Sequence, residues 1–323
     1  MKKTILLTAN YKGKPLEIVQ RLVPDGFNLL SMDTSSQEEL EKKATKADYI
    51  LASGNLKINS NVLKAANHLV MIQRLGVGLD SLDLGALKIH KIPVYVNRGI
   101  NSNSVAEHAV MLMLAALRRL PLINATTKSG IWKKQEQGVL TRELSMQTVG
   151  IIGIGNIGKR TTALLQPYGC KLLYYDVCRL TPSEEEAYHI EFKSLSELLC
   201  LADIISLHCP LTDITREIIR KENISKMKDG VIIINTSRGG LICEEDLLDA
   251  LRTGKIGYAC LDVYCEEPAK NMELLQQENV ICTPHIAGNT YDSFSSMMQL
   301  AFRNILLFEQ GKQKEIEDCL VNP

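Results

Sequence analysis

The sequence predicts an α/β protein of two domains, each built on a doubly wound parallel sheet. The chain has 323 residues, which is more than one ordinary domain contains. Short apolar runs alternate with polar, helix-compatible stretches, and strands that alternate with helices form parallel sheets covered on both faces. Near the middle of the chain, a glycine-rich segment opens a second series of strands and helices.

The first series forms an α/β domain of its own. Its expected strands are Thr4–Thr8, Phe27–Ser31, Tyr49–Ser53, Leu69–Gln73 and Val94–Asn97. Ser36–Ala47 has helical spacing, with a serine to cap it and with Glu38 and Glu39 in the first turn, where the helix dipole favours acids. A long helix is expected over Ser104–Leu120, ended by Pro121, and a final helix follows near the C-terminus.

The central segment has the pattern of a dinucleotide-binding turn. An apolar strand, Val149–Ile152, precedes the sequence Gly-Ile-Gly-Asn-Ile-Gly, and a helical stretch and a second strand ending in Asp176 follow. Gly153 permits the tight turn, Gly155 lets the backbone approach a pyrophosphate, and Gly158 lets the helix pack on the strand. The unpaired amides at the positive end of that helix suit phosphate. The motif predicts a bound dinucleotide.

Asp176 indicates which dinucleotide binds. Its carboxylate is placed to accept hydrogen bonds from a ribose diol and repels a 2′-phosphate, so NAD is favoured over NADP. Arg179, three residues later, softens that preference if it faces the same ribose. We expect NAD as the cofactor.

Polar segments follow the later strands of the second series. The remaining expected strands are Leu172–Tyr175, Ile204–Leu207, Val231–Ile234, Ala259–Leu261 and Val280–Cys282, which makes six, as in a doubly wound dinucleotide fold. The segments after the last three carry Arg238, Glu267 and His285. Ligands of open parallel sheets bind at the carboxyl ends of the strands, so these side chains should converge near the cofactor. They suit oxidation of an anionic alcohol: arginine for the carboxylate, histidine for the proton and glutamate to orient the histidine.

Composition argues against several other classes of protein. Lysine plus arginine and aspartate plus glutamate number 37 each, so no overall charge recruits nucleic acid or an anionic membrane. The longest apolar stretch, Val110–Leu117, is far shorter than the roughly 20 residues of a membrane helix. The apolar run at the N-terminus ends by Asn10 and reads as a strand rather than a signal peptide. Nine dispersed cysteines indicate reduced cytoplasmic thiols rather than a disulfide framework or a metal site.

Motifs along nearly the whole chain resemble the D-isomer-specific 2-hydroxyacid dehydrogenase family. They lie at residues 74–80, 104–108, 153–158, 208–212, 235–240, 261–268 and 283–288. The resemblance implies a flavodoxin-like substrate domain over residues 1–100 and 288–323, and a Rossmann NAD-binding domain over residues 101–287, with a substrate cleft between them. It also implies a homodimer formed through the nucleotide domain, with Trp132 in internal packing or in the subunit interface.

The resemblance assigns the catalytic roles. Arg238 binds the substrate carboxylate and polarises the C2 oxygen, His285 is the general acid/base, and Glu267 is its partner. A carboxylate beside an imidazole favours the imidazolium, so a charged His285 donates its proton to the carbonyl oxygen in reduction, and the neutral ring accepts the hydroxyl proton in oxidation. Backbone amides around Val77 and Gly78 hold the carboxylate.

The resemblance also assigns the cofactor contacts. The Asn156 and Ile157 amides meet the pyrophosphate, and Asp262 fixes the nicotinamide carboxamide unless it is only a structural turn acid. His108 and His208 are expected to be structural, the first on a helix and the second at the end of a strand. The other residues expected near the cofactor are Cys209, Pro210, Thr236, Ser237 and Gly288, together with Arg238 and His285.

The substrate within the family stays open. Two catalytic segments and Arg74 resemble the D-3-phosphoglycerate dehydrogenases of serine biosynthesis, and Arg74 either binds a phosphate or is an ordinary surface arginine. That branch often has an arginine after the third strand, where this chain has Ala52–Asn55. The absence of that arginine favours a short unphosphorylated 2-keto acid, such as glyoxylate or hydroxypyruvate, as the substrate. The chain ends at Pro323, so we expect no C-terminal regulatory domain and no allosteric serine control through one.

Two other functions are consistent with the same fold. Some relatives are transcriptional co-repressors that sense NAD(H) and bind peptide motifs, and they retain the arginine, glutamate and histidine. This chain lacks the proline- or serine-rich tail expected of such a scaffold. Formate dehydrogenases pair their histidine with a glutamine, whereas this chain has Glu267.

Overall fold

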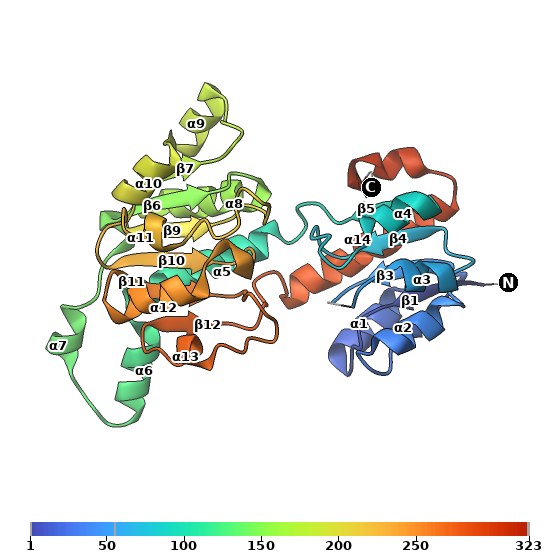
Figure 1. The fold of residues 1–323 in the computed structure, drawn as a ribbon, viewed down its shortest axis with the longest axis horizontal. Helices are drawn as coiled ribbons and strands as arrows, with labels where there is room; N and C mark the ends of the chain where they lie inside the picture. Colours follow the sequence, from blue (N-terminus) through green and yellow to red (C-terminus); the bar gives the residue numbers. More distant parts are fainter. Residues whose placement is uncertain (1, 55, 322–323) are drawn as a thin grey trace. The chain divides into compact units, whose positions relative to one another are not determined.

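The computed structural model describes residues 2–54 and 56–321 and divides into two compact units. Unit 1 combines Met1–Asn101 with Tyr291–Pro323, and unit 2 is Ser102–Thr290. In Figure 1, unit 1 contains the blue and cyan elements and the red C-terminal helix, whereas unit 2 runs from teal to orange. Each unit has its own sheet, of six strands in unit 1 and seven in unit 2.

The sheet of unit 1 is parallel except at one edge. Its strands are β1 (Lys3–Leu7), β2 (Phe27–Ser31), β3 (Tyr49–Ala52), β4 (Met71–Arg74), β5 (Val94–Val96) and β13 (Leu320–Val321). Their order is β13-β5-β4-β3-β1-β2, so the winding direction reverses between β1 and β3. The five predicted strands are confirmed with small shifts at their ends. Strand β13, which pairs antiparallel with β5, was not predicted because two residues carry no periodicity.

Helices cover both faces of this sheet. They are α1 (Lys14–Leu22), α2 (Gln37–Ala44), α3 (Ser60–Ala65), α4 (Leu84–His90), α14 (Tyr291–Glu309) and the 3-10 helix η4 (Gln313–Cys319). The Ser36 side chain caps α2 by accepting the Glu39 amide hydrogen at 3.1 Å, as the sequence predicts. Helices α1 and α14 share one apolar core with the sheet, and α2, α3 and α4 share the other.

Buried amides connect the C-terminal helix α14 to the sheet. Asn304 donates to the Gln73 side-chain oxygen at 3.1 Å, and Gln73 donates to the Asn97 side-chain oxygen at 3.0 Å. Asn97 in turn donates to the Met297 carbonyl at 2.8 Å. Because unpaired buried amides are costly, this chain of bonds fixes where α14 lies on β4 and β5.

The sheet of unit 2 is entirely parallel. Its strands are β6 (Thr148–Ile152), β7 (Lys171–Tyr175), β8 (Glu191–Phe192), β9 (Ile204–Leu207), β10 (Val231–Asn235), β11 (Ile256–Leu261) and β12 (Val280–Cys282). Their order is β12-β11-β10-β9-β6-β7-β8, which reverses between β6 and β9. The six predicted strands are confirmed, and the two-residue edge strand β8 is additional. Ligands of doubly wound sheets bind where the order reverses, at the carboxyl ends of the strands.

Helices surround the sheet of unit 2. They are α5 (Ser102–Leu117), α6 (Leu120–Lys128), α7 (Lys134–Gly138), α8 (Asn156–Leu165), α9 (Pro182–Tyr188), α10 (Leu195–Leu201), α11 (Lys221–Ile224), α12 (Glu244–Arg252) and α13 (Met272–Leu275), with 3-10 turns η1 (Leu144–Met146), η2 (Gln166–Tyr168) and η3 (Gly239–Leu241). Helix α5 packs on α8, β10 and β11 (Figure 1). Its apolar face is buried in one of the two cores of the unit.

The predicted C-terminal end of α5 was wrong. The helix ends at Leu117, Arg119 adopts a left-handed conformation with φ of 49°, and Pro121 lies in the first turn of α6. Proline lacks an amide hydrogen that the first turn leaves unpaired anyway, so here it begins a helix instead of ending one. Among the described residues, no single helix has the length and apolar content to cross a membrane; α5 and α6 meet that test only together, and they are bent by 60° at their junction.

Candidate active site

The glycine loop after β6 fits closely against its neighbours. Gly153 has φ of 96°, and a β-carbon there would lie 2.5 Å from the backbone nitrogen of Cys209. A β-carbon at Gly158 would lie 2.1 Å from the Gly153 carbonyl oxygen. Both contacts are too short for any side chain, so glycine is required at the turn and at the crossing of α8 with the strand.

The middle glycine borders open space at the N-terminus of α8. No atom lies within 4 Å of a β-carbon built at Gly155, which precedes the first helical residue. The first α-helical hydrogen bond runs from the Lys159 amide to the Gly155 carbonyl, so the Asn156 and Ile157 amides lie in the unpaired first turn. Open space beside amide donors at the positive end of a helix fits a pyrophosphate.

Asp176 follows β7 and contacts the glycine loop directly. Its Oδ2 accepts the Ile154 amide hydrogen at 2.7 Å, and its Oδ1 accepts the Cys178 amide hydrogen at 3.0 Å. The Arg179 guanidinium pairs with both carboxylate oxygens of Glu185, at 2.8 and 3.0 Å, and it stacks on an aromatic ring. The positive charge that weakened the NAD prediction is therefore already paired within the protein.

The loop after β9 meets the glycine loop where the strand order reverses. Cys209 is buried, its carbonyl accepts the Ser237 hydroxyl at 2.6 Å, and Pro210 beside it is exposed. The His208 Nε2 lies 2.9 Å from the Ser206 hydroxyl, and burial lowers the pKa of His208 to about 4. A neutral, hydrogen-bonded histidine agrees with the structural role predicted for His208.

The loop after β10 is shaped by a side chain that the sequence analysis did not single out. The Asn235 amide donates to the Arg238 carbonyl at 2.9 Å and accepts the Ser237 amide hydrogen at 3.1 Å. The Arg238 guanidinium is half-buried and donates to the Ser237 carbonyl at 2.8 Å. The Thr236 hydroxyl is buried without a hydrogen-bond partner among the described residues. Such a buried, unpaired hydroxyl at the end of a central strand fits the wall of a ligand-binding site.

His285 and Glu267 are paired. His285 Nδ1 lies 2.7 Å from Glu267 Oε2, and the other Glu267 oxygen accepts the Tyr264 amide hydrogen at 3.3 Å. An ionised carboxylate only accepts hydrogen bonds, so Nδ1 carries a hydrogen and Nε2 is left for other partners. The His285 side chain is 49% exposed and its backbone has φ of 54°, a conformation that non-glycine residues rarely adopt. The conformation of the loop backbone therefore directs the imidazole ring of His285 toward solvent.

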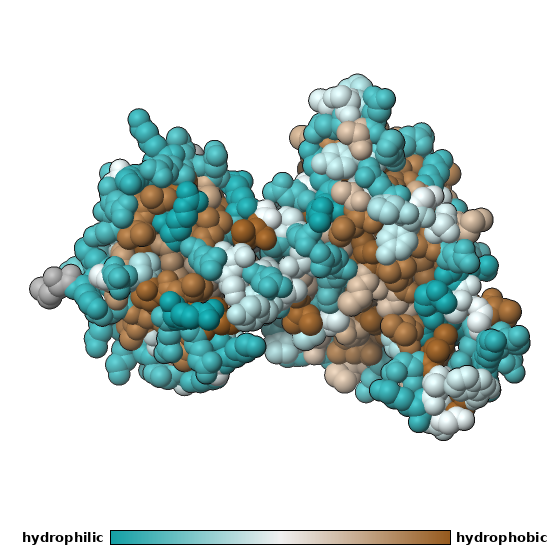
Figure 2. All heavy atoms as spheres, turned by 180° about the vertical axis from the view of Figure 1, so that it is seen from behind, coloured by the Kyte–Doolittle hydropathy of each residue, from teal (hydrophilic) through white to brown (hydrophobic). Residues whose placement is uncertain are grey.

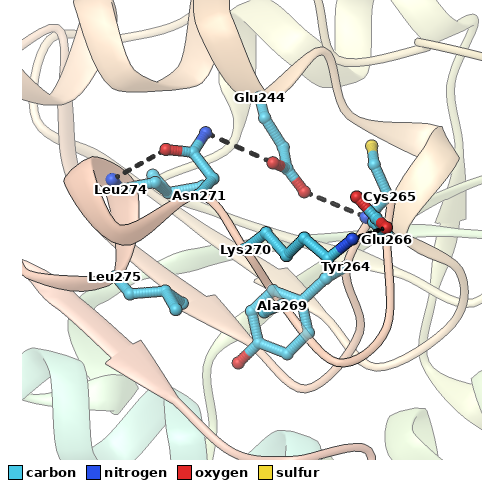
Figure 3. Close-up of a pocket in the computed structure, with 9 residues that line it drawn as sticks. All are labelled: Glu244, Tyr264, Cys265, Glu266, Ala269, Lys270, Asn271, Leu274 and Leu275. Atoms are coloured by element: carbon cyan, nitrogen blue, oxygen red, sulfur yellow. Dashed lines mark hydrogen bonds and ion pairs between the residues drawn. The ribbon is translucent and has the colours of Figure 1, made fainter.

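Glu244, at the start of α12, supports the segment that carries Glu267. Its Oε1 accepts the Cys265 amide hydrogen at 2.9 Å, and its Oε2 accepts from the Asn271 side chain at 3.3 Å. Figure 3 shows Glu244 between these two partners, on the wall of a small pocket. Neither His285 nor Arg238 lines that pocket, so it is separate from the proposed catalytic side chains.

Asp262, at the end of β11, holds the segment after His285. Its buried carboxylate accepts the Ile286 amide hydrogen with Oδ1 and the Ala287 amide hydrogen with Oδ2, both at 2.9 Å. Gly288 follows in the same turn. These bonds favour the interpretation of Asp262 as a structural turn acid, and its contact with a nicotinamide stays a prediction.

The substrate residues expected in unit 1 lie at the carboxyl edge of its sheet. Arg74, at the end of β4, donates from Nε to the Gly78 carbonyl at 3.0 Å and from Nη1 to the Gly54 carbonyl at 3.2 Å. The Val77 side chain is exposed in the same loop. Arg74 therefore contacts both neighbouring loops, and its binding of a phosphate stays a prediction. Asn55, part of the predicted substrate loop, lies outside the described residues.

Comparison with known proteins identifies the family. Residues 110–287 match the family model for the D-isomer specific 2-hydroxyacid dehydrogenase NAD binding domain. The chain belongs to this family. Its NAD-binding domain, with the glycine loop and Asp176 described above, makes it an NAD-dependent D-2-hydroxyacid dehydrogenase.

Relatives of this dehydrogenase differ in substrate and length. A hydroxypyruvate reductase of Thermotoga maritima is 38% identical over 80% of this chain and 83% of its own. A D-3-phosphoglycerate dehydrogenase of Archaeoglobus fulgidus is 35% identical over 91% of this chain, which spans only 56% of that relative. The crystal structure of a D-lactate dehydrogenase from Aquifex aeolicus, complexed with NAD and lactic acid, is 30% identical with a TM-score of 0.84 and covers 99% of both chains.

Proposed function

We propose that this dehydrogenase reduces a short, unphosphorylated 2-keto acid at C2, with hydroxypyruvate and glyoxylate as the preferred class. Arg238 binds the carboxylate, and His285, held by Glu267, exchanges the proton. The single observation that carries the catalytic assignment is the 2.7 Å hydrogen bond between His285 Nδ1 and Glu267. Bound NADH supplies the hydride.

The proton steps follow from that hydrogen bond. Glu267 fixes the tautomer with hydrogen on Nδ1, so Nε2 is the atom that exchanges a proton with substrate. In reduction, protonated Nε2 donates to the C2 oxygen and the ring becomes neutral. In oxidation, neutral Nε2 accepts the hydroxyl proton, and Glu267 stabilises the imidazolium. Arg238 presents planar donors that match a carboxylate, which orients C2.

Hydroxyl groups at the edge of unit 1 support the unphosphorylated substrate. The order of its strands reverses between β1 and β3, and there the Tyr11 hydroxyl lies 2.6 Å from the Ser53 hydroxyl. Thr8 donates to the Ser53 carbonyl at 2.7 Å and accepts the Ser53 amide hydrogen at 2.9 Å. Neutral hydroxyls suit the C3 group of hydroxypyruvate better than a phosphate dianion. We further propose that the Val77 and Gly78 loop binds the substrate carboxylate.

Turnover of a substrate panel tests this proposal. Purified protein is assayed for NADH oxidation with glyoxylate, hydroxypyruvate, pyruvate and phosphohydroxypyruvate. We expect kcat/KM to be higher for the unphosphorylated acids. Preference for phosphohydroxypyruvate would contradict the substrate class and would favour the phosphoglycerate dehydrogenase alternative. Bound NADH without turnover of any acid would favour a cofactor-sensing role.

We also propose that the protein is a homodimer formed through unit 2. The projecting segment of α6, α7 and the residues that follow exposes large apolar side chains, and Figure 2 shows hydrophobic atoms at its surface. They include Ile131, Trp132, Val139, Leu140 and Met146. The Trp132 side chain is 81% exposed, which is unfavourable for an indole unless a partner covers it. Light scattering should give twice the mass of one chain, and Trp132→Glu should shift it toward the monomer.

A further inference from the structure

A histidine outside the proposed catalytic group lies against the segment that carries His285. His108, on α5, is largely buried, and its Nε2 lies 3.0 Å from the Thr283 hydroxyl and 3.8 Å from Asp262 Oδ1. Helix α5 packs directly on β11, the strand that immediately precedes Asp262 (Figure 1). The ring therefore faces the point from which the catalytic segment leaves the sheet.

The proton positions in this cluster follow from hydrogen-bond chemistry. The Thr283 hydroxyl has one hydrogen, and its oxygen lies 2.5 Å from Asp262 Oδ1. The carboxylate only accepts, so the hydroxyl donates to Asp262 and must accept from His108. Nε2 of His108 therefore carries a hydrogen. Burial lowers the pKa of His108 against the opposing effect of Asp262, which favours the neutral ring with hydrogen on Nε2.

Asp262 connects the His108–Thr283 hydrogen bond to the segment that carries His285. Its two carboxylate oxygens accept the amide hydrogens of Ile286 and Ala287, and its backbone carbonyl accepts the His285 amide hydrogen at 2.8 Å. The segment has little apolar packing of its own, because the side chains of His285 and Ile286 are both exposed. Hydrogen bonds donated to Asp262 by these backbone amides therefore hold His285 in its left-handed conformation.

We propose that His108 is a positioning residue for His285. Its Nε2 hydrogen fixes the Thr283 hydroxyl, which orients the Asp262 carboxylate, and that carboxylate holds the backbone on both sides of Ile286. His108 touches neither substrate nor cofactor in this scheme. The inference rests on the proposed role of His285 and extends it to a residue on a different element of the fold.

Replacement of His108 tests the proposal. His108→Leu keeps a side chain of similar size without the donor, whereas His108→Gln offers an amide donor at a comparable distance from the helix. We expect His108→Leu to lower kcat about 10- to 100-fold, as loss of an orienting hydrogen bond does elsewhere, with KM changed less than about threefold. His108→Gln should recover most of kcat. Hydrogen exchange of the peptide spanning residues 283–290 should be faster in His108→Leu only.

Two further variants separate positioning from general destabilisation. Val110→Ala removes buried apolar volume from the same helix and leaves the hydrogen-bonding side chains of His108, Thr283 and Asp262 in place. It should lower Tm while kcat stays within about twofold of wild type. Thr283→Val removes the relay hydroxyl at constant shape and covers the case in which His108→Leu does not fold. We expect Thr283→Val to lower kcat as much as His108→Leu does. The double variant should lose no more kcat than either single variant, because both substitutions interrupt the same chain of hydrogen bonds.

The outcomes distinguish this inference from the proposed function. Loss of kcat in His108→Leu and Thr283→Val, with recovery in His108→Gln, supports the inference. Wild-type kcat in both while His285→Ala is inactive overturns the inference and leaves the proposed function intact. An equal loss of kcat in Val110→Ala and His108→Leu also overturns the inference. Full turnover by His285→Ala overturns the proposed function itself.

Discussion

Both units have a doubly wound sheet whose strand order reverses once, but the loops at the two reversals differ in chemistry. In unit 2 the strand order reverses between β6 and β9, and the loops there are shaped by backbone contacts that exclude any side chain at Gly153 and Gly158. In unit 1 the order reverses between β1 and β3, and side-chain hydroxyls of Thr8, Tyr11 and Ser53 meet there. A diphosphate shared by all dinucleotides is suited to backbone amides, whereas a particular substrate requires particular side chains.

The largest effect should come from the edge of unit 2. His285→Ala removes the group proposed to exchange the proton, and general acid/base catalysis is worth about 10²- to 10⁴-fold in rate. We expect kcat to fall within that range while NADH affinity, measured by fluorescence titration, changes little. Asn279 immediately precedes β12, at the opposite end of that strand from His285, and offers a control position as Asn279→Ala. Near-normal turnover by His285→Ala would contradict the assignment.

Arg238→Lys tests whether geometry or charge alone matters in the same unit. Lysine keeps the positive charge but loses the planar pair of donors that fits a carboxylate. We expect kcat/KM for hydroxypyruvate to fall about 30-fold, equivalent to about 2 kcal/mol. The half-buried guanidinium and its 2.8 Å bond to the Ser237 carbonyl make a rigid donor, so steady-state kinetics should show the loss. Unchanged kinetics would mean that the carboxylate binds elsewhere.

Ser53→Arg tests whether the loop after β3 in unit 1 sets the preference for an unphosphorylated substrate. An arginine here places in the loop after β3 the charge that the phosphoglycerate branch often has. We expect kcat/KM to move about 10-fold toward phosphohydroxypyruvate relative to hydroxypyruvate, with NADH affinity unchanged. Ser53→Ala is the matched control, because it removes the Tyr11 contact without adding charge. If NADH affinity changed while the substrate preference stayed constant, Ser53 would act on the cofactor and not on the substrate. That result would contradict the contrast drawn between the two units.

Asp176→Ala should have a similar or smaller effect, confined to the cofactor. The carboxylate that disfavours a 2′-phosphate is removed, so the ratio of kcat/KM with NADH to that with NADPH should fall about 10-fold. Arg179 stays paired with Glu185 and does not compensate. The keto acid preference at constant cofactor should not move. An unchanged cofactor ratio would count against Asp176 as the ribose ligand.

The last effect concerns the stability of the fold in acid and leaves turnover at neutral pH unchanged. Burial lowers the pKa of His208 to about 4, below its unfolded value near 6.5, so the unfolded chain binds the proton more readily. This group therefore favours folding above about pH 6.5, and its contribution is lost as pH falls toward 4, by an amount on the order of 3 kcal/mol. His208→Gln keeps a partner for Ser206 without titrating. Its free energy of unfolding should fall less than that of wild type between these pH values; identical slopes would contradict this account.

The contrast between the units also explains what the sequence predicted. The glycine loop could be predicted because its three glycines recur at a fixed spacing: Gly153 and Gly158 leave no room for a side chain, and Gly155 borders open space at the helix N-terminus. Glu267 and His285 could be predicted because they follow the ends of strands. The ends of α5 and the strands β8 and β13 were not predicted, since proline begins or ends helices according to context and two-residue strands have no period.

The support behind the catalytic segment was likewise invisible in the sequence. The His108 contact joins residues 175 positions apart, and Thr283 and Asp262 are 21 apart. No local pattern links them, because their meeting depends on how α5 packs on β11 and on side-chain rotamers. The sequence therefore predicted His108 only as a structural residue of a helix.

The central claim is hydride transfer to C2 of an unphosphorylated 2-keto acid at the edge of unit 2. It is tested most directly by incubating the protein with hydroxypyruvate and NADH deuterated at both C4 positions, and by analysing the product with NMR and chiral chromatography. We expect D-glycerate with one deuterium at C2, formed at least about 100-fold more slowly by His285→Ala. NADH that binds but yields no deuterated hydroxy acid from any member of the keto acid panel would contradict the account.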